Sequence, residues 1–317
     1  SLSINNIAKA FNSPLEGIFP TQVNTAASKG TDQASSTLYN AGHIIKRNIP
    51  IAKPKVFIPV FPGTNCEYDT EAAFRRAGAD VHTLIIKNLT PKTVEESVIA
   101  IEKAINASQI VMLPGGFSGG DEPDGSGKFI AATFRNPRIA EAVEKLLYQR
   151  DGLMLGICNG FQALIKLGLL PYGKICDLHS DSPTLTYNQI GRHISRMVQT
   201  KVVSNLSPWL TKASLGAIHT MAVSHGEGRF YASSEVINTL RKNGQIATQY
   251  VDHNDNVSMD IAYNPNGSID AIEGITSPDG RVFGKMGHSE RITNDLAINI
   301  PGEKNQLLFE SGVEYFK

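Results

Sequence analysis

The residue with the clearest chemical potential in this chain is a cysteine set between two glycines. Gly156-Ile157-Cys158-Asn159-Gly160 follows an apolar run typical of a buried strand and precedes the amphipathic stretch 161–167. A nucleophile at such a strand-to-helix turn is held in a strained backbone conformation, and flanking glycines are needed because a Cβ there would collide with neighbouring chain. The start of a helix also favours a thiolate. The pattern therefore predicts that Cys158 is a nucleophile rather than an inert core cysteine.

A nucleophilic thiol needs a base, and two histidines stand in a His-x-Glu pattern that could supply one. His288 and Glu290 come just after the predicted strand 281–286, and His225 and Glu227 show the same spacing earlier in the chain. In extended chain, residues i and i+2 lie on one face, so the glutamate can bind one imidazole nitrogen and leave the other for the thiol. Spacing alone does not choose between the pairs. We favour His288 as the base, oriented by Glu290, in a Cys-His-Glu triad.

A glycine-rich turn after another predicted strand could stabilise developing charge. Leu113-Pro114-Gly115-Gly116-Phe117-Ser118 begins at the carboxyl end of the apolar run 110–113. Acyl transfer develops an oxyanion, and the N–H groups of Gly115 and Gly116 can bind it without obstruction from side chains. The N–H of Asn159, next to the nucleophile, would be a further donor. A plain surface turn is the alternative interpretation of this segment.

The composition excludes several classes of function. The chain has 317 residues with 30 Lys+Arg and 30 Asp+Glu, so it carries no basic footprint for nucleic acid or an anionic membrane. Its three cysteines are widely separated, which gives neither a disulfide framework nor a CxxC metal pattern, and is typical of a reducing compartment. No apolar run reaches the roughly 18–20 residues that a membrane span needs. We expect a cytoplasmic protein with no metal site and no nucleic-acid or membrane partner.

The elements that must position these residues alternate between strand and helix. Apolar runs predict strands at 56–61, 81–86, 110–113 and 152–157, and amphipathic stretches predict helices at 71–77, 93–106, 139–147 and 161–167. This alternation predicts an α/β fold with a doubly wound, mostly parallel central sheet and helices on both faces, as in flavodoxin-like proteins. Because Pro59 lies in the first strand, we expect this strand less at the centre of the sheet than at its edge. Ligands bind at the carboxyl ends of such strands, where the candidate residues lie.

The remainder of the chain is predicted to be organised differently. Shorter and more antiparallel strands are predicted at 197–203, 217–223, 228–232, 246–251, 269–275 and 281–286, which together form a smaller antiparallel β region. Residues 1–52 are rich in Ser, Thr, Asn and Ala and are predicted to be an arm or linker, with some helix near 7–11. The main domain then spans 53–300, and 301–317 form a C-terminal tail. Because the chain opens with Ser1, we expect it to be a piece of a longer polypeptide.

Five motifs, in order along the chain, resemble one enzyme family. They lie at 61–67, 113–118, 156–162, 225–229 and 287–291. Together with the cysteine elbow, the donor loop and the His-x-Glu pair, they resemble the class I (triad) glutamine amidotransferases. Within that class they resemble the glutaminase of phosphoribosylformylglycinamidine synthase, in its long single-chain form. The resemblance covers about residues 53 to 291.

The resemblance implies an activity, partners and a substrate site. Cys158 would attack the side-chain amide of L-glutamine and form a glutamyl thioester, with His288 shuttling protons. The ammonia would pass to a synthase site that uses ATP and magnesium to aminate formylglycinamide ribonucleotide in purine biosynthesis. That site would belong to a synthase domain of the same polypeptide or to a separate subunit, and this chain would need no cofactor. The resemblance also implies a glutamine site formed by Phe117, Gln162, His225 and Gly226.

Two alternatives stay open at this point. A triad glutaminase of another synthase, of the GMP or CTP type, would share the elbow and the base. A non-catalytic relative on the same sheet would use Cys158 as a redox sensor, but such a sensor has no use for the pair of His288 and Glu290. Two segments, 119–125 and 188–193, depart from the family's usual sequence and leave the rim of the pocket and the docking surface undefined.

Overall fold

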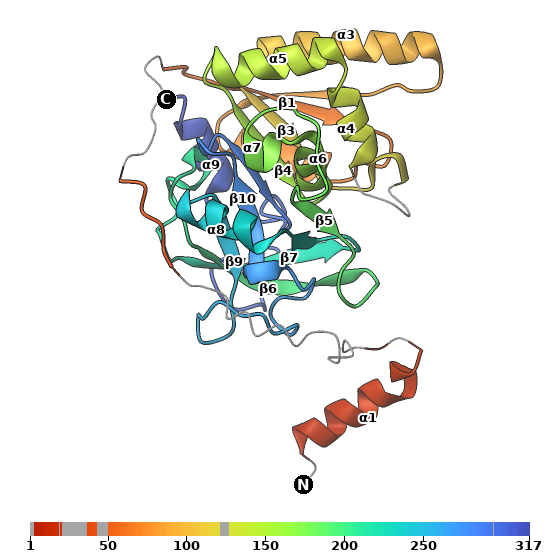
Figure 1. Ribbon diagram of the computed structural model, residues 1–317, viewed down its shortest axis with the longest axis vertical. Coiled ribbons are helices and arrows are strands. Elements are labelled where there is room, and N and C mark those ends of the chain that lie inside the picture. Colours follow the sequence, from red (N-terminus) through yellow and green to blue (C-terminus); the bar gives the residue numbers. More distant parts are fainter. Residues whose placement is uncertain (1–2, 19, 21–36, 43–49, 121–126, 294) are drawn as a thin grey trace.

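One mixed sheet forms the centre of the molecule (Figure 1). The structure, a computed structural model, describes residues 3–18, 20, 37–42, 50–120, 127–293 and 295–317. Within these residues nine strands form one sheet in the order β2-β1-β3-β4-β11-β10-β9-β6-β7. Their bounds are β1 Lys55–Val60, β2 Asp80–Ile85, β3 Ile110–Leu113, β4 Leu153–Ile157, β6 Ile194–Val202, β7 Ile218–His225, β9 Ile246–Tyr250, β10 Ile272–Thr276 and β11 Val282–Lys285.

The sheet changes character between its two halves. From β2 to β11 neighbouring strands are parallel, whereas β10, β9, β6 and β7 pair antiparallel. The predicted antiparallel region is therefore mostly a continuation of the central sheet. Two further described strands, β5 (Thr184–Thr186) and β8 (Arg229–Tyr231), form a separate antiparallel pair. The fold class expected from the sequence is confirmed.

Helices cover the parallel half of the sheet. They are α2 Glu67–Arg76, α3 Pro91–Ala107, α4 Lys128–Phe134, α5 Pro137–Tyr148, α6 Asn159–Leu167, α7 Leu169–Tyr172 and α9 Leu308–Glu314, whereas α8 Ser234–Lys242 precedes β9 in the antiparallel half. Helix α2 leads from β1 outward to β2, and α3 leads back across β1 to β3. Because crossovers between parallel strands are right-handed, this reversal places α2 and α3 on opposite faces. Helix α3 packs beside α5 (Figure 1), and α2 contacts α9.

The first strand is central in spite of its proline. Strand β1 lies between β2 and β3 and pairs with β2 along its whole length. Its pairing with β3 includes only Val56 and Phe57. Pro59 lies beyond this short stretch, so the N–H that it lacks costs no ladder hydrogen bond to β3. The expectation that this strand avoids the centre is wrong for that reason.

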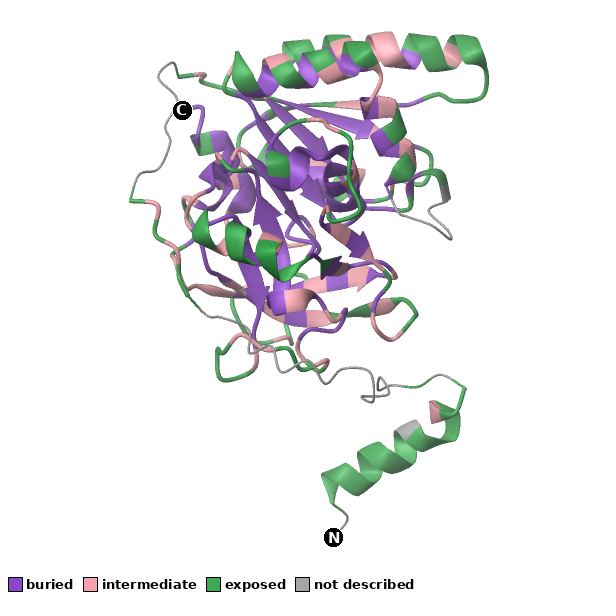
Figure 2. Ribbon diagram, viewed as in Figure 1, coloured by how far each residue is buried: buried purple, intermediate pink, exposed green. Residues whose placement is uncertain are grey.

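The two ends of the chain differ in how they pack. Helix α1 (Ile4–Glu16) is longer than the helix expected near 7–11, and none of its described residues is buried (Figure 2). Helix α9, in contrast, lies in the core, where Phe309 packs edge-to-face against Phe74 at 4.9 Å. The division into an arm, a domain and a tail stays a prediction. Among the described residues, no helix has the length and hydropathy that crossing a bilayer requires.

Candidate active site

Cys158 lies at the sharp turn between β4 and α6, at the carboxyl edge of the parallel strands. Its backbone has φ 52° and ψ −107°, a conformation that costs an L residue about 1–3 kcal/mol. A Cβ on Gly160, in the first turn of α6, would collide with the carbonyl oxygen of Leu113. The N–H of Cys158 donates to the carbonyl oxygen of Lys285 at 2.9 Å. The surrounding sheet and helix thus hold the cysteine in the strained turn that the glycine pattern predicts.

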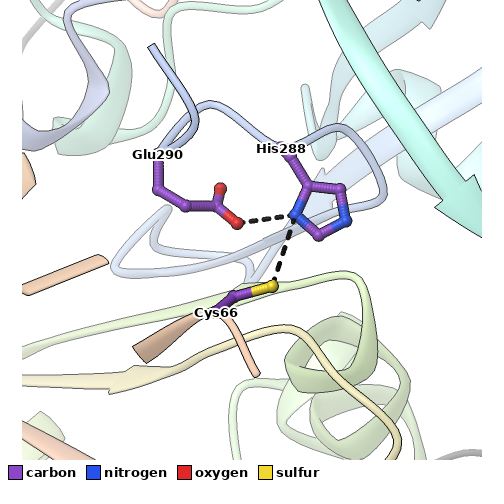
Figure 3. Close-up of side chains that lie close together, drawn as sticks. All are labelled: Cys66, His288 and Glu290. Carbon is purple, nitrogen blue, oxygen red and sulfur yellow. Dashed lines mark hydrogen bonds and ion pairs between the residues drawn. The ribbon is translucent and has the colours of Figure 1, made fainter. Parts of the chain in front are cut away.

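His288 and Glu290 form a buried pair in the segment after β11. Nδ1 of His288 lies 2.6 Å from Oε1 of Glu290, and the two side chains are 2% and 0% exposed. The N–H of His288 donates to the carbonyl oxygen of Ala222 in β7 at 2.9 Å, which fixes the backbone beside the ring. Figure 3 shows the second ring nitrogen on the side away from Glu290. The carboxylate therefore orients the ring and leaves Nε2 for another partner.

The pair carries opposite charges. Burial lowers the pKa of His288, but the charge of Glu290 and hydrogen bonds to Cys158, Cys66 and Glu290 outweigh burial and raise that pKa well above its ordinary value. Burial raises the pKa of Glu290, but the charge and hydrogen bond of His288 outweigh burial and lower it. An imidazolium and a carboxylate therefore face each other in the interior, where their attraction is stronger than at a surface.

The imidazole of His288 also lies next to the nucleophile. The side chain of Cys158 is among the groups whose interaction raises the pKa of His288. A Cβ on Gly115 would lie 2.9 Å from Cε1 of His288 and 3.5 Å from Cβ of Cys158. Any side chain at position 115 would thus enter the space between the thiol and the base. The structure brings together Cys158, His288, Glu290 and Gly115, four residues from three separate segments.

Cys66 belongs to the same cluster. It is buried just before α2, and its Sγ lies 3.9 Å from Nδ1 of His288 (Figure 3). Sγ also accepts a hydrogen bond from Nη2 of Arg291 at 2.9 Å. The signal that could have found it is its position after β1, because β1 and β3 are neighbours and their carboxyl ends meet at one edge.

The donor atoms of Cys66, His288 and Glu290 all lie within 4.8 Å of one another, a spacing compatible with a metal ion. Two contacts argue against a metal at this position. Glu290 occupies Nδ1 of His288, and the guanidinium of Arg291 binds Sγ of Cys66, where its positive charge repels a cation. We therefore interpret the three residues as a hydrogen-bonded cluster.

The glycine turn after β3 lies against the turn after β1. Gly116, with φ 142°, forms an isolated bridge with Thr64, and the carbonyl oxygen of Gly115 accepts from the N–H of Asn65 at 3.3 Å. Among the described residues, neither the N–H of Gly115 nor that of Gly116 donates to another backbone group. Asn159 is buried at the start of α6, and its side chain accepts from the N–H of Ser118 at 3.3 Å. Gly115 thus lies beside the turn that carries Cys158, and Asn159 directly follows the cysteine in that turn.

Of the residues implied for glutamine binding, Gln162 and His225 are buried, Gly226 is half-buried and Phe117 is exposed. Gln162 donates from Nε2 to the carbonyl oxygen of Glu227 at 2.5 Å and accepts from Asn159 at 3.0 Å, so it is not a solvated helix residue. Phe117 is 46% exposed, and its ring lies 6.2 Å from that of His193. Gly226 follows His225 at the end of β7. Residues 121–125 of the first departing segment lie outside the described residues.

His225 has the same spacing to a glutamate as His288 but a different environment. Its Nδ1 lies 3.0 Å from Oδ1 of Asn188, which belongs to the second departing segment. Burial, followed by the charges of His288 and His193, lowers the pKa of His225 to about 3. The ring is therefore neutral at ordinary pH. Sγ of Cys158 lies 3.7 Å from the carbonyl oxygen of Ser224, so His225 borders the site.

Comparisons with known proteins place the chain among glutamine amidotransferases. A family model described as a CobB/CobQ-like glutamine amidotransferase domain matches residues 53–316. The PurQ subunit of phosphoribosylformylglycinamidine synthase from Aquifex aeolicus is 33% identical over 244 residues, which cover 76% of this chain and 92% of the relative. The PurQ subunit from Methanococcus maripaludis is 34% identical over 281 residues, covering 83% and 97%. This chain belongs to the phosphoribosylformylglycinamidine synthase glutaminase family.

A solved structure agrees with membership in the phosphoribosylformylglycinamidine synthase glutaminase family. PurLQS from Thermotoga maritima matches with a TM-score of 0.60 and 28% identity, covering 84% of this chain and 100% of that chain. The family expected from five sequence motifs is confirmed, and with it the assignment to a glutamine amidotransferase of purine biosynthesis. The roles of the individual residues stay predictions.

Proposed function

We propose that this chain hydrolyses L-glutamine at Cys158 and supplies the ammonia for converting formylglycinamide ribonucleotide to formylglycinamidine ribonucleotide. The observation that carries the proposal is the buried pair of His288 and Glu290 beside a cysteine in a strained turn. Family membership supports the reaction class, and the geometry supports the assignment of each role.

The first half-reaction forms a thioester and releases ammonia. The thiolate of Cys158 bonds to the amide carbon of glutamine, and the carbonyl electrons move to oxygen. The N–H groups of Gly115, Gly116 and Asn159 bind that oxyanion. The imidazolium of His288 gives its proton to the amide nitrogen, the C–N bond breaks, and ammonia leaves.

The second half-reaction restores the enzyme. His288, now neutral, takes a proton from a water molecule as the water attacks the thioester carbon. The C–S bond breaks, glutamate leaves, and Cys158 returns as the thiolate paired with the imidazolium. Glu290 stays ionised throughout, because it holds the ring by Nδ1 and stabilises the imidazolium rather than exchanging protons with it.

Residues beside the nucleophile orient the substrate. Gln162 is rigidly held by its bonds to Asn159 and to the backbone of Glu227, so it can present a fixed polar edge to the amino-acid end of glutamine. His225 and Gly226 border the thiol at the end of β7, and the exposed ring of Phe117 forms part of the rim.

The proposal assigns the remaining chemistry to a partner. ATP and magnesium would be bound by a synthase part, in the same long polypeptide or in a separate subunit, and residues 1–52 would connect to it. The relative from Aquifex aeolicus is a synthase subunit, and the matching Thermotoga maritima structure is that of PurLQS, which supports a partner of this kind. A cytoplasmic location is part of the proposal and agrees with three cysteines that are all free.

The test combines this chain with its synthase part and supplies either glutamine or free ammonia. We expect Cys158→Ser to abolish glutamate release and glutamine-dependent amination, while ammonia-dependent amination continues because the synthase site lies elsewhere. Loss of both activities, or glutaminase activity that survives the substitution, would overturn the proposal. Amination of a GMP-type or CTP-type acceptor in place of formylglycinamide ribonucleotide would reassign the product.

A further inference from the structure

A buried lysine lies directly behind the segment that carries the proposed base. Lys285 is the last residue of β11, three positions before His288, and its side chain has no exposed surface. Its Nζ donates to Oγ of Ser289 at 2.8 Å and to Oε1 of Gln306 at 3.0 Å, and it also contacts the sulfur of Met221. The ammonium group is thus bound to the residue that stands between His288 and Glu290.

The counter-ion of this lysine binds the same segment from the other side. Nζ of Lys285 lies 3.7 Å from Oε1 of Glu273 in β10, which is also fully buried. That same oxygen accepts the N–H of Gly287 at 2.6 Å, and the other carboxylate oxygen accepts from Thr248 at 2.5 Å. The ion pair therefore fixes the residue before His288 and the residue after it.

The lysine also binds the nucleophile, through its backbone. The carbonyl oxygen of Lys285 accepts the N–H of Cys158 at 2.9 Å, and the register pairs Lys285 with Ile157. One residue is thus hydrogen-bonded to the turn that carries the thiol and, through Ser289, to the segment that carries the imidazole.

Stability alone does not account for the ion pair. Removing an ammonium and a carboxylate from water is costly, and apolar residues of similar volume often serve a core as well or better. Burial lowers the pKa of Lys285, while the charges of Glu273 and Glu290 oppose that effect. A buried charged pair beside a catalytic segment is better explained by the geometry that it imposes, because its partners are specific atoms rather than apolar surface.

We propose that Lys285 and Glu273 are positioning residues that hold His288 and Glu290 in register with Cys158. The inference rests on the proposed glutaminase function. If the tethers at Gly287 and Ser289 loosen, the short bond between His288 and Glu290 weakens, and the thiol and the imidazole lose their alignment. A displacement of about 1 Å in such a group can cost 10²-fold in rate.

The pH profile separates positioning from a general loss of structure. Four titratable groups face His288 from other elements: Cys158 from the turn before α6, Cys66 from the start of α2, Glu273 from β10 and His225 from β7. Its own segment contributes Lys285, Glu290 and Arg291. The raised pKa of His288 depends on Glu290. Weakening the hydrogen bond between them therefore lowers this pKa, and the imidazolium loses its proton at lower pH. A partly unfolded enzyme would instead lose amplitude without a shift in its profile.

The experiment compares Lys285→Met with Arg241→Met in the chain assembled with its synthase part. Arg241 forms an ion pair with the buried carboxylate of Asp270 at 2.8 Å, and its side chain bonds to Asn238 and Asp270 rather than to residues of the site, so its loss provides a structural control. For Lys285→Met we expect kcat for glutamate release to fall about 10-fold or more, KM to change less than about 3-fold, and the basic limb of the profile to move to lower pH. Arg241→Met should keep the wild-type profile.

Two further variants keep the inference falsifiable if Lys285→Met folds poorly. Lys285→Met combined with Glu273→Gln removes both buried charges, and we expect folding to recover while kcat stays low. Ser289→Ala removes only the hydroxyl tether, and we expect a smaller shift of the basic limb in the same direction. Wild-type kcat in the charge-free double variant, or an unshifted profile in Ser289→Ala, would overturn the inference. Absence of glutaminase activity in the wild-type assembly would instead contradict the proposed function.

Discussion

The two His-x-Glu segments have the same spacing in the sequence and opposite environments in the structure. His288 faces the carboxylate of Glu290 at 2.6 Å, and its pKa lies well above the ordinary value. His225 faces the amide of Asn188 at 3.0 Å, and burial lowers its pKa to about 3. One ring is therefore suited to carry a proton and the other is not.

The difference shows that the partner of a ring decides its chemistry, and that the partner can come from elsewhere in the chain. Asn188 lies 37 residues before His225, and its Oδ1 lies beside Nδ1 of that ring. The backbone carbonyl of Glu227, in turn, binds Gln162. We therefore predict that the segment with His225 shapes the glutamine pocket and that the segment with His288 carries out proton transfer.

The strongest test of this comparison is to remove each ring in turn, beginning with His288. We expect His288→Ala to lower kcat for glutamate release by about 10²–10⁴-fold, because general acid–base catalysis typically contributes that much. Ammonia-dependent amination should continue. A larger loss in His225→Gln than in His288→Ala, measured in the same assembly, would exchange the two roles.

A second prediction concerns the carboxylate that distinguishes the pairs. Glu290→Gln removes the charge that raises the pKa of His288, so the imidazolium is lost at lower pH and the basic limb of kcat/KM moves down. We expect kcat at neutral pH to fall by about 10²-fold, since the ring also loses its orientation. Profiles of glutamate release between about pH 6 and 10 check the shift. A basic limb that stays in place would mean that Glu290 does not set the charge of His288.

His225 should influence binding more than chemistry. We expect His225→Gln to raise KM for glutamine about 3–10-fold while kcat changes less than about 3-fold, because loss of uniform binding acts on KM. Steady-state kinetics with glutamine provides the measurement. A fall in kcat without a change in KM would contradict the interpretation of this segment as part of the pocket.

The same substitution should change acid stability. The folded-state pKa of His225 lies below its unfolded value, so the neutral ring favours folding above pH 6.5, and this contribution is lost as pH falls from 6.5 toward about 3. His225→Gln removes one such group, and the slope of unfolding free energy against pH in that window should decrease by about 1.4 kcal/mol per unit. Urea titrations at several pH values measure the slope. Equal slopes in the two proteins would show that the ring titrates normally.

The parallel half of the molecule was predictable because its signals are local. The run 110–113 is strand β3 in full, and the run 152–157 differs from β4 by one residue. Buried parallel strands are continuous apolar runs, which a sequence displays directly. The cysteine elbow was equally visible, since glycines at fixed offsets indicate a strained turn.

Other features depend on contacts that no local pattern contains. Helix α2 begins at Glu67 rather than 71, without a side-chain cap from Cys66 to mark its start. Cys66 meets His288 across 222 positions of the sequence. In the sequence, Lys285 looks like an ordinary polar residue at the end of a strand. Its burial follows only from the way β10, β11 and the segment with Gln306 pack together. Long-range packing decided these cases.

The most direct test of the central claim is the site and rate of covalent labelling by a chloroketone analogue of glutamine. The assembled enzyme is treated between about pH 6 and 9, and labelled peptides are identified by mass spectrometry. We expect label on Cys158 and none on Cys66 or Cys176. We also expect the rate of labelling at Cys158 to be at least about 10²-fold lower in His288→Ala than in the wild type. In His225→Gln this rate should stay within about 3-fold of the wild-type rate. Label on Cys66, or an undiminished rate without His288, would contradict the account.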